Sequence, residues 1–195
     1  MVPDNGKQFF SLLYRGRKIA RRYLVTNGFD GALTMLGLMT GFYVSGTTEL
    51  EVAINACLGA AIALFVSGFS SAYLSETAER KKELQEMEQA LLIDLKESQY
   101  GAASRYLPLF IASVNGFSPL LLSLLILTPL FLAYFGIAWP CSPFLLAIAV
   151  ALFCIFLLGV YLGKISRSFW LWAGLRAVLI AAGMVAIILL FDIGR

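Results

Sequence analysis

Five apolar runs, each long enough to cross the hydrocarbon core of a bilayer, constrain this chain more than any other feature. A spanning helix needs about 20 apolar residues, and it must satisfy its own backbone hydrogen bonds because the bilayer core holds no water. Hydrophobic residues make up 59% of the 195 positions and charged residues 14%, too apolar for a soluble domain. We therefore expect an all-α integral membrane protein with five transmembrane helices. The runs are Leu24–Gly46, Ala53–Ser75, Leu107–Phe135, Phe144–Gly163 and Phe169–Phe191.

The charge of the connecting segments predicts the orientation of the chain. Residues 1–23 combine apolar and basic residues without a signal-peptide cleavage site, which predicts an interfacial amphipathic arm. Lys and Arg recur in 76–106 and 164–167, whereas the loops "TTELEV" and "GIAWPCSP" have none. By the positive-inside rule the N-terminus is cytoplasmic and the C-terminus lies outside. The net charge of +3 is thus an orientation signal, and we expect no nucleic-acid partner.

Between spans 24–75 and 107–195, the segment 76–106 is expected to form a cytoplasmic acidic stalk. Helix-forming residues continue without Pro or Gly from the second span to Tyr100, so we expect that helix to extend into the cytoplasm. At about 100° per residue, its acidic residues fall within an arc of roughly 80°. Those residues are Glu76, Glu79, Glu83, Glu86, Asp94 and Glu97, beside an apolar stripe of Leu84, Met87, Leu91 and Leu95.

The acidic face has two interpretations. It is either a solvated face beside a helix-packing seam, or a site for a divalent cation or partner that relieves the repulsion between glutamates. Like charges three or four residues apart destabilise a helix by about 0.2–0.5 kcal/mol per pair. Oxygen ligands suit Mg²⁺, Ca²⁺, Mn²⁺ or Fe²⁺, with a thioether as a softer contact. The candidate metal ligands are Glu76, Glu79, Glu83, Glu86 and Met87.

The remaining metal-binding residue types are scarce. The chain has no histidine, and Cys57, Cys141 and Cys154 lack the spacing of a thiolate site or a disulfide framework. Any metal site must therefore use carboxylates, thioethers, backbone oxygens and water. We find no catalytic constellation, so an enzyme is not expected, and no cofactor is implied.

Asp30 is an ionisable residue inside the first apolar run, "TNGFDGALTMLG". A carboxylate within the bilayer costs about 2.5–3.5 kcal/mol on insertion scales and generally faces a bundle interior or an aqueous cavity. We favour a residue of a transport path. The alternative is a cap at the start of the first membrane helix, a role that Thr26 or Asn27 would also suit. Met35 and Met39 point away from Asp30 and are expected to pack in the core.

Other intramembrane polar and small residues have packing interpretations. We expect Asn115 and the serines of "FVSGFSSAYL" mainly to bond backbone and neighbouring helices, although they could line a path. Gly37-x-x-x-Gly41 and Gly159-x-x-x-Gly163 permit close helix contact within a bundle or a dimer.

Several segments in order resemble the vacuolar iron transporter family. They are "TNGFDGALTMLGLMTGFYVSG", "SAYLSETAERKKE", "NGFSPLLLSLLILTPL" and "FLLGVYLGKIS" followed by "WAGLRAVLIAAGMVAIILL". The resemblance covers about Val25 to Leu190 and suggests an archaeal-type branch. It implies five transmembrane helices, a homodimer with a path along its interface, and export of Fe²⁺ or related ions in exchange for protons.

By residue, the resemblance matches Asp30 to an aspartate in the translocation path and Glu79, Glu83 and Glu86 to metal-binding stalk glutamates. In the second span, Ala60 and Gly68 stand where eukaryotic members have a glutamate and a methionine. Our leading hypothesis is a homodimeric Fe²⁺ or Mn²⁺/proton antiporter in the cell membrane of a prokaryote. The alternative is a non-transporting metal sensor or docking protein with an acidic cytoplasmic arm.

Overall fold

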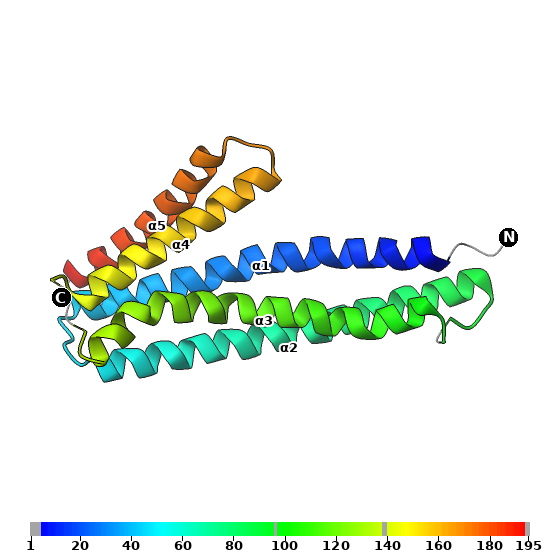
Figure 1. Ribbon diagram of the computed structural model, residues 1–195, viewed down its shortest axis with the longest axis horizontal. Helices are drawn as coiled ribbons and strands as arrows, with labels where there is room; N and C mark the ends of the chain where they lie inside the picture. Colours follow the sequence, from blue (N-terminus) through cyan, green and yellow to red (C-terminus); the bar gives the residue numbers. More distant parts are fainter. Residues whose placement is uncertain (1–4, 96, 138–139, 194–195) are drawn as a thin grey trace. The chain divides into compact units, whose positions relative to one another are not determined.

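The computed structural model describes the backbone of residues 5–95, 97–137 and 140–193, and the side chains of 16–95, 97–98, 100–137 and 140–191. Within these ranges the chain is all-α, as predicted, and forms five helices (Figure 1). The first four residues of the predicted arm lie outside the described residues. The helices are α1 (Asn5–Val44), α2 (Leu50–Leu91), α3 (Gln99–Tyr134), α4 (Pro143–Ile165) and α5 (Trp170–Ile193).

Four helices, α2 to α5, are long and apolar enough to cross a membrane. The predicted first span falls in α1, which does not reach the same hydropathy. Asn27 and Asp30, together with threonines and glycines, dilute its apolar residues. Within the described residues these four helices indicate a multi-pass membrane protein, and a fifth span in α1 stays a prediction.

Helix α1 joins two segments that the sequence suggested were separate. It runs without a break from the basic arm into the first apolar run. The alternative that Asp30, Thr26 or Asn27 caps a membrane helix is therefore wrong, because no helix starts near them. A capping side chain needs free backbone N–H groups, and in mid-helix these are already bonded within the helix.

The expected continuous helix to Tyr100 is also wrong. Helix α2 extends past the second apolar run, as predicted, but it ends at Leu91, and Leu92 adopts a left-handed φ of 55°. The Glu88 carboxylate accepts a hydrogen bond from the Leu95 N–H at 3.0 Å, and Ser98 Oγ accepts one from the Gly101 N–H at 3.2 Å. Ser98 thus caps the start of α3. The segment 76–106 therefore consists of the end of α2 and the start of α3, joined by a turn, rather than one continuous helix.

The chain divides into two compact units. Unit 1 consists of residues 1–24 and 65–117, and unit 2 of residues 25–64 and 118–195. In unit 1, Ala20 of α1 packs with Leu107 and Ile111 of α3. The basic arm is therefore attached to the start of α3 through its apolar face.

Unit 2 holds the larger core. Met35 and Met39 of α1 are fully buried there, which confirms the prediction that they pack in the core. They share one cluster with residues of α2, α3, α4 and α5. The buried α3 members are Ile126, Leu127 and Leu130.

Helices α4 and α5 lie side by side as an antiparallel hairpin (Figure 1). A Cβ atom added at Gly159 would lie 2.8 Å from the carbonyl oxygen of Ala173, and one at Gly163 would lie 2.7 Å from the Ala173 Cβ. The spacing Gly159-x-x-x-Gly163 therefore permits close packing within this hairpin, one of the two roles considered for it.

Candidate functional site

Three consecutive residues of α1 have three different environments in unit 2. Phe29 lines a pocket, Asp30 is exposed on the protomer, and Gly31 is buried. A Cβ at Gly31 would lie 2.7 Å from Pro119 Cα and 2.8 Å from its carbonyl oxygen. Only glycine therefore allows α1 to approach α3 this closely. At Gly31 the helix packs closely against α3, and the neighbouring Asp30, about 100° around the helix, is exposed.

Asp30 has no ion-pair or side-chain hydrogen-bond partner within the described part of the chain. Thr34 and Gly41 follow it on the same helical face and are each half-buried. Nothing approaches within 4 Å of a Cβ placed at Gly41. Gly37 lies on the same face, and a Cβ there would meet Met184 and Ile188 of α5 at 3.8 and 3.9 Å. This face of α1 is therefore small and polar, covered in part by α5 at Gly37 and open beside Gly41.

The stalk glutamates are held largely by ion pairs within α2. Glu76 and Arg80 are both buried, at 6% and 7% exposure, and Arg80 Nη2 lies 3.5 Å from Glu76 Oε2. Arg80 Nη1 donates to Glu83 Oε2 at 2.6 Å. Arg80 therefore bridges two of the four candidate carboxylates and relieves the repulsion from which a cation was inferred.

The other stalk candidates, Glu79, Glu86 and Met87, take no part in this bridge. Lys82 pairs with Glu86 at 3.9 Å on the exposed surface, Glu79 is exposed, and Met87 is half-buried. Among the described residues, no group of three or more His, Cys, Asp or Glu is placed to hold a metal ion. A cation bound to Glu76, Glu83 or Glu86 would compete with Arg80 or Lys82 for the carboxylate.

The two second-span positions that depart from the resembled family have packing roles. Ala60 packs against the core of unit 2. In unit 1, Asn115 of α3 donates from Nδ2 to the Gly68 carbonyl at 2.7 Å, and a Cβ at Gly68 would lie 3.3 Å from the Asn115 carbonyl oxygen. Ser70 and Ser71 bond carbonyls of their own helix. The backbone and helix-linking roles expected for Asn115 and these serines are confirmed.

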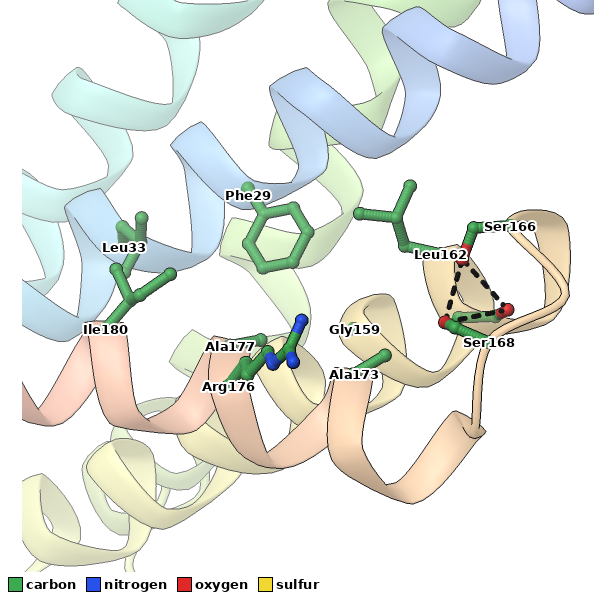
Figure 2. Close-up of a pocket in the computed structure, with 11 residues that line it drawn as sticks. Phe29, Leu33, Gly159, Leu162, Ser166, Ser168, Ala173, Arg176, Ala177 and Ile180 are labelled. Carbon is green, nitrogen blue, oxygen red and sulfur yellow. Dashed lines mark hydrogen bonds between the residues drawn. The ribbon is translucent and has the colours of Figure 1, made fainter.

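Unit 2 also contains a pocket of about 410 Å³ among α1, α4 and α5 (Figure 2). Its wall is mainly apolar and includes Phe29 and Leu33 of α1. The polar lining groups are Ser166 and Ser168 in the turn after α4, and Arg176 of α5. Figure 2 shows the Arg176 side chain extending from α5 toward Phe29.

Comparison with known proteins gives one informative relative. The chain is 31% identical over 172 residues to "Uncharacterized protein MJ0645" of Methanocaldococcus jannaschii, covering 87% of this chain and 85% of the relative. The chain belongs to the same family as this archaeal protein. No protein-family model matches the chain, and no solved structure matches it.

Neither Arg80 nor Arg176 was identified from the sequence as a candidate functional or structural residue. Arg80 was counted only as a basic loop residue, yet its spacing of i+4 from Glu76 and i−3 from Glu83 was a usable signal for ion pairing. Arg176 lies in the segment "WAGLRAVLIAAGMVAIILL" of the fifth apolar run. An arginine in an apolar run is a functional candidate by the same argument as Asp30. The pocket beside it, however, also needs α1, which is distant in sequence from α4 and α5.

Proposed function

We propose that this protein is a divalent metal ion transporter for Fe²⁺ or Mn²⁺. It acts as a homodimer of five-span protomers, exports the ion from the cytoplasm in exchange for protons, and is related to the vacuolar iron transporter family. In a prokaryote it resides in the cell membrane, with its N-terminus in the cytoplasm. The observation that carries the proposal is the exposed Asp30 carboxylate on α1, among helices that are apolar enough to cross a membrane.

Membrane energetics supports a path residue at this position. Because an ionised aspartate facing lipid is costly, such a residue faces protein or a water-filled cavity. The protomer leaves Asp30 exposed, so its polar surroundings must come from a second copy or from water. The buried methionines on the opposite side of α1 favour the inclusion of this helix in the membrane bundle.

The same face of α1 supports a dimer. Thr34 and Gly41 are small and half-buried, and the space beside Gly41 is open. Small residues on one face allow two membrane helices to approach closely. Two α1 helices meeting on this face would place two Asp30 carboxylates across the interface, which is a set of hard oxygen ligands for a divalent ion.

Proton exchange follows from the chemistry of a carboxylate. It must be deprotonated to bind a metal ion, so binding of the ion releases a proton and protonation releases the ion. Asp30 would thus alternate between the two substrates. The absence of a methionine at Gly68 leaves a path made of oxygen ligands, which favours Mn²⁺ and Fe²⁺ over softer ions.

The deciding experiment is metal-driven proton flux in proteoliposomes, with Fe²⁺, Mn²⁺, Co²⁺, Zn²⁺ and Ca²⁺ tested against an internal pH dye. We expect Asp30→Asn to abolish both metal uptake and proton movement, because the amide cannot exchange a proton for an ion. The dimer should persist in the variant. Glu51→Gln, an exposed acid in the first turn of α2, is the matched control and should transport normally.

Flux that is equal in Asp30→Asn and wild type would remove Asp30 from the mechanism. No flux of any ion in the wild type would favour the alternative of a metal sensor or docking protein. The stalk then becomes the relevant site, and calorimetry with Mn²⁺ on the full-length protein would test Glu76, Glu79, Glu83, Glu86 and Met87 as ligands.

A further inference from the structure

The pocket of unit 2 has the composition of a site for an amphipathic anion. Its wall is mostly apolar, and its polar groups are one guanidinium and two hydroxyls. No carboxylate lines it, and within the described residues Arg176 has neither an ion pair nor a side-chain hydrogen bond. Asp30 is the neighbour of the pocket residue Phe29 in the sequence, but it forms no ion pair with Arg176. The one cation at the pocket therefore lacks a counter-charge.

The surroundings of the pocket place it at a membrane surface. Its serines lie in the turn between α4 and α5, and Phe169, Trp170 and Trp172 directly after this turn are all exposed. Exposed tryptophans are typical of the headgroup level of a bilayer. Lys164 at the end of α4 and Arg167 in the turn add two exposed cations nearby. Arg176 lies six residues beyond Trp170, about 9 Å along the helix, close enough for its long side chain to reach the headgroups.

We propose that this pocket binds the headgroup phosphate of an anionic phospholipid of the cytoplasmic leaflet. The guanidinium of Arg176 pairs with two phosphate oxygens, since its planar fork matches that geometry. The Ser166 and Ser168 hydroxyls are 2.8 Å apart and donate to the Gly163 carbonyl at 3.2 and 3.4 Å, so they supply further hydrogen bonds to the phosphate by rotating away from that carbonyl. The first part of an acyl chain lies against Phe29, Leu33 and Ile180. Basic pockets between membrane helices on the cytoplasmic side are suited to such lipids.

A lipid fits this site better than free phosphate does. The apolar wall would gain nothing from a soluble anion, whereas it offers an acyl chain a surface that is shielded from water. The cavity volume of about 410 Å³ lies within the range of small-molecule sites. Because the bound lipid would touch α1, α4 and α5 together, we expect it to stabilise unit 2. The inference does not depend on metal transport.

The test uses the full-length, delipidated protein reconstituted in phosphatidylcholine vesicles with and without phosphatidylglycerol. Native mass spectrometry counts the lipids retained by each protein, and thermal unfolding reports stabilisation. We expect selective retention of phosphatidylglycerol by the wild type. Arg176→Gln should weaken that retention about tenfold or more, as for loss of a charge-assisted hydrogen bond. Arg176→Lys, which keeps the charge, should retain part of the binding and shows whether the site still folds.

Lys164→Gln is the matched control, because Lys164 is an exposed cation at the end of α4 that does not line the pocket. It should retain the lipid like the wild type. Equal retention by Arg176→Gln and wild type would overturn the proposal. So would equal stabilisation by inorganic phosphate without anionic lipid, which would indicate a soluble ligand. Loss of the dimer in Arg176→Gln without any lipid dependence would instead assign Arg176 to a contact between copies.

Discussion

At the scale of single residues, charges in this chain are decided by what lies beside them. Arg80 and Arg176 are both arginines on long helices, yet Arg80 is buried between two glutamates and Arg176 is exposed beside a pocket. The two acids show the same contrast. Glu76 is buried and paired, whereas Asp30 is exposed and has no ion pair among the described residues. Of these four residues, Asp30 and Arg176 have no ion pair among the described residues, and each is assigned a ligand by one of the proposals above.

Loss of Arg80 should destabilise the protein strongly. Arg80→Gln leaves Glu76 buried without a cation, and we expect a loss of about 3 kcal/mol of unfolding free energy, the lower end for breaking a buried pair. The lower end applies because Glu83 is partly exposed. Chemical denaturation in detergent micelles measures this loss.

Lys82→Gln is the control on the same helix. Its pair with Glu86 is exposed, with side chains 70% and 65% accessible, so the change should stay within about 0.5 kcal/mol. Similar losses in the two variants would show that the Glu76–Arg80–Glu83 bridge contributes little. A gain of Mn²⁺ binding in Arg80→Gln, seen by calorimetry, would show that Arg80 occupies a potential cation site.

At the scale of helices, close approach depends on glycines that meet backbone rather than flexible side chains. Gly31 allows α1 to approach Pro119 of α3, and Gly159 allows α4 to approach Ala173 of α5. The sequence showed the small-residue spacings but gave no information on which helix each would contact. Gly159 packs inside a protomer, whereas Gly41 faces open space.

Gly159→Ala should therefore separate α4 from α5. Its Cβ would lie 2.8 Å from a backbone oxygen, which cannot move aside alone, so we expect a loss of about 1–3 kcal/mol in unfolding free energy. Gly183→Ala, on α5 with nothing within 4 Å, should be neutral or stabilising by up to about 1 kcal/mol through helix propensity. Denaturation in detergent compares the two, and an unaffected Gly159→Ala variant would contradict the packing described here.

At the scale of the whole molecule, α1, α2 and α3 each contribute to both units, and α4 and α5 belong wholly to unit 2. The basic arm and the acidic stalk are both in unit 1, and the core shared by all five helices is in unit 2. This division separates a charged unit from an apolar one. The charge pattern predicts that the charged unit faces the cytoplasm.

The natural cysteines allow a direct test of that orientation. Cys141 is exposed in the loop after α3, whereas Cys57 and Cys154 are buried. A membrane-impermeant maleimide added to intact cells should label Cys141 alone, because this loop is predicted to lie outside. Gln89→Cys in a Cys141→Ser background places a thiol on the exposed stalk, and it should react only after permeabilisation. The opposite pattern would invert the proposed orientation.

The sequence by itself determined that the chain is helical and has segments apolar enough to cross a membrane, because the length and apolarity of a span are properties of consecutive residues. It also showed that Asp30 is an ionisable residue within an apolar run, that Met35 and Met39 face the core, and that α4 carries a face of small residues. It erred on the helix to Tyr100, since the hydrogen bonds of Glu88 and Ser98 that form the turn outweigh local helix propensity. Only the tertiary structure decided that the Glu76–Arg80 pair is buried and that Arg176 borders a pocket. Burial depends on which distant helices come together, and no pattern within a single helix specifies that.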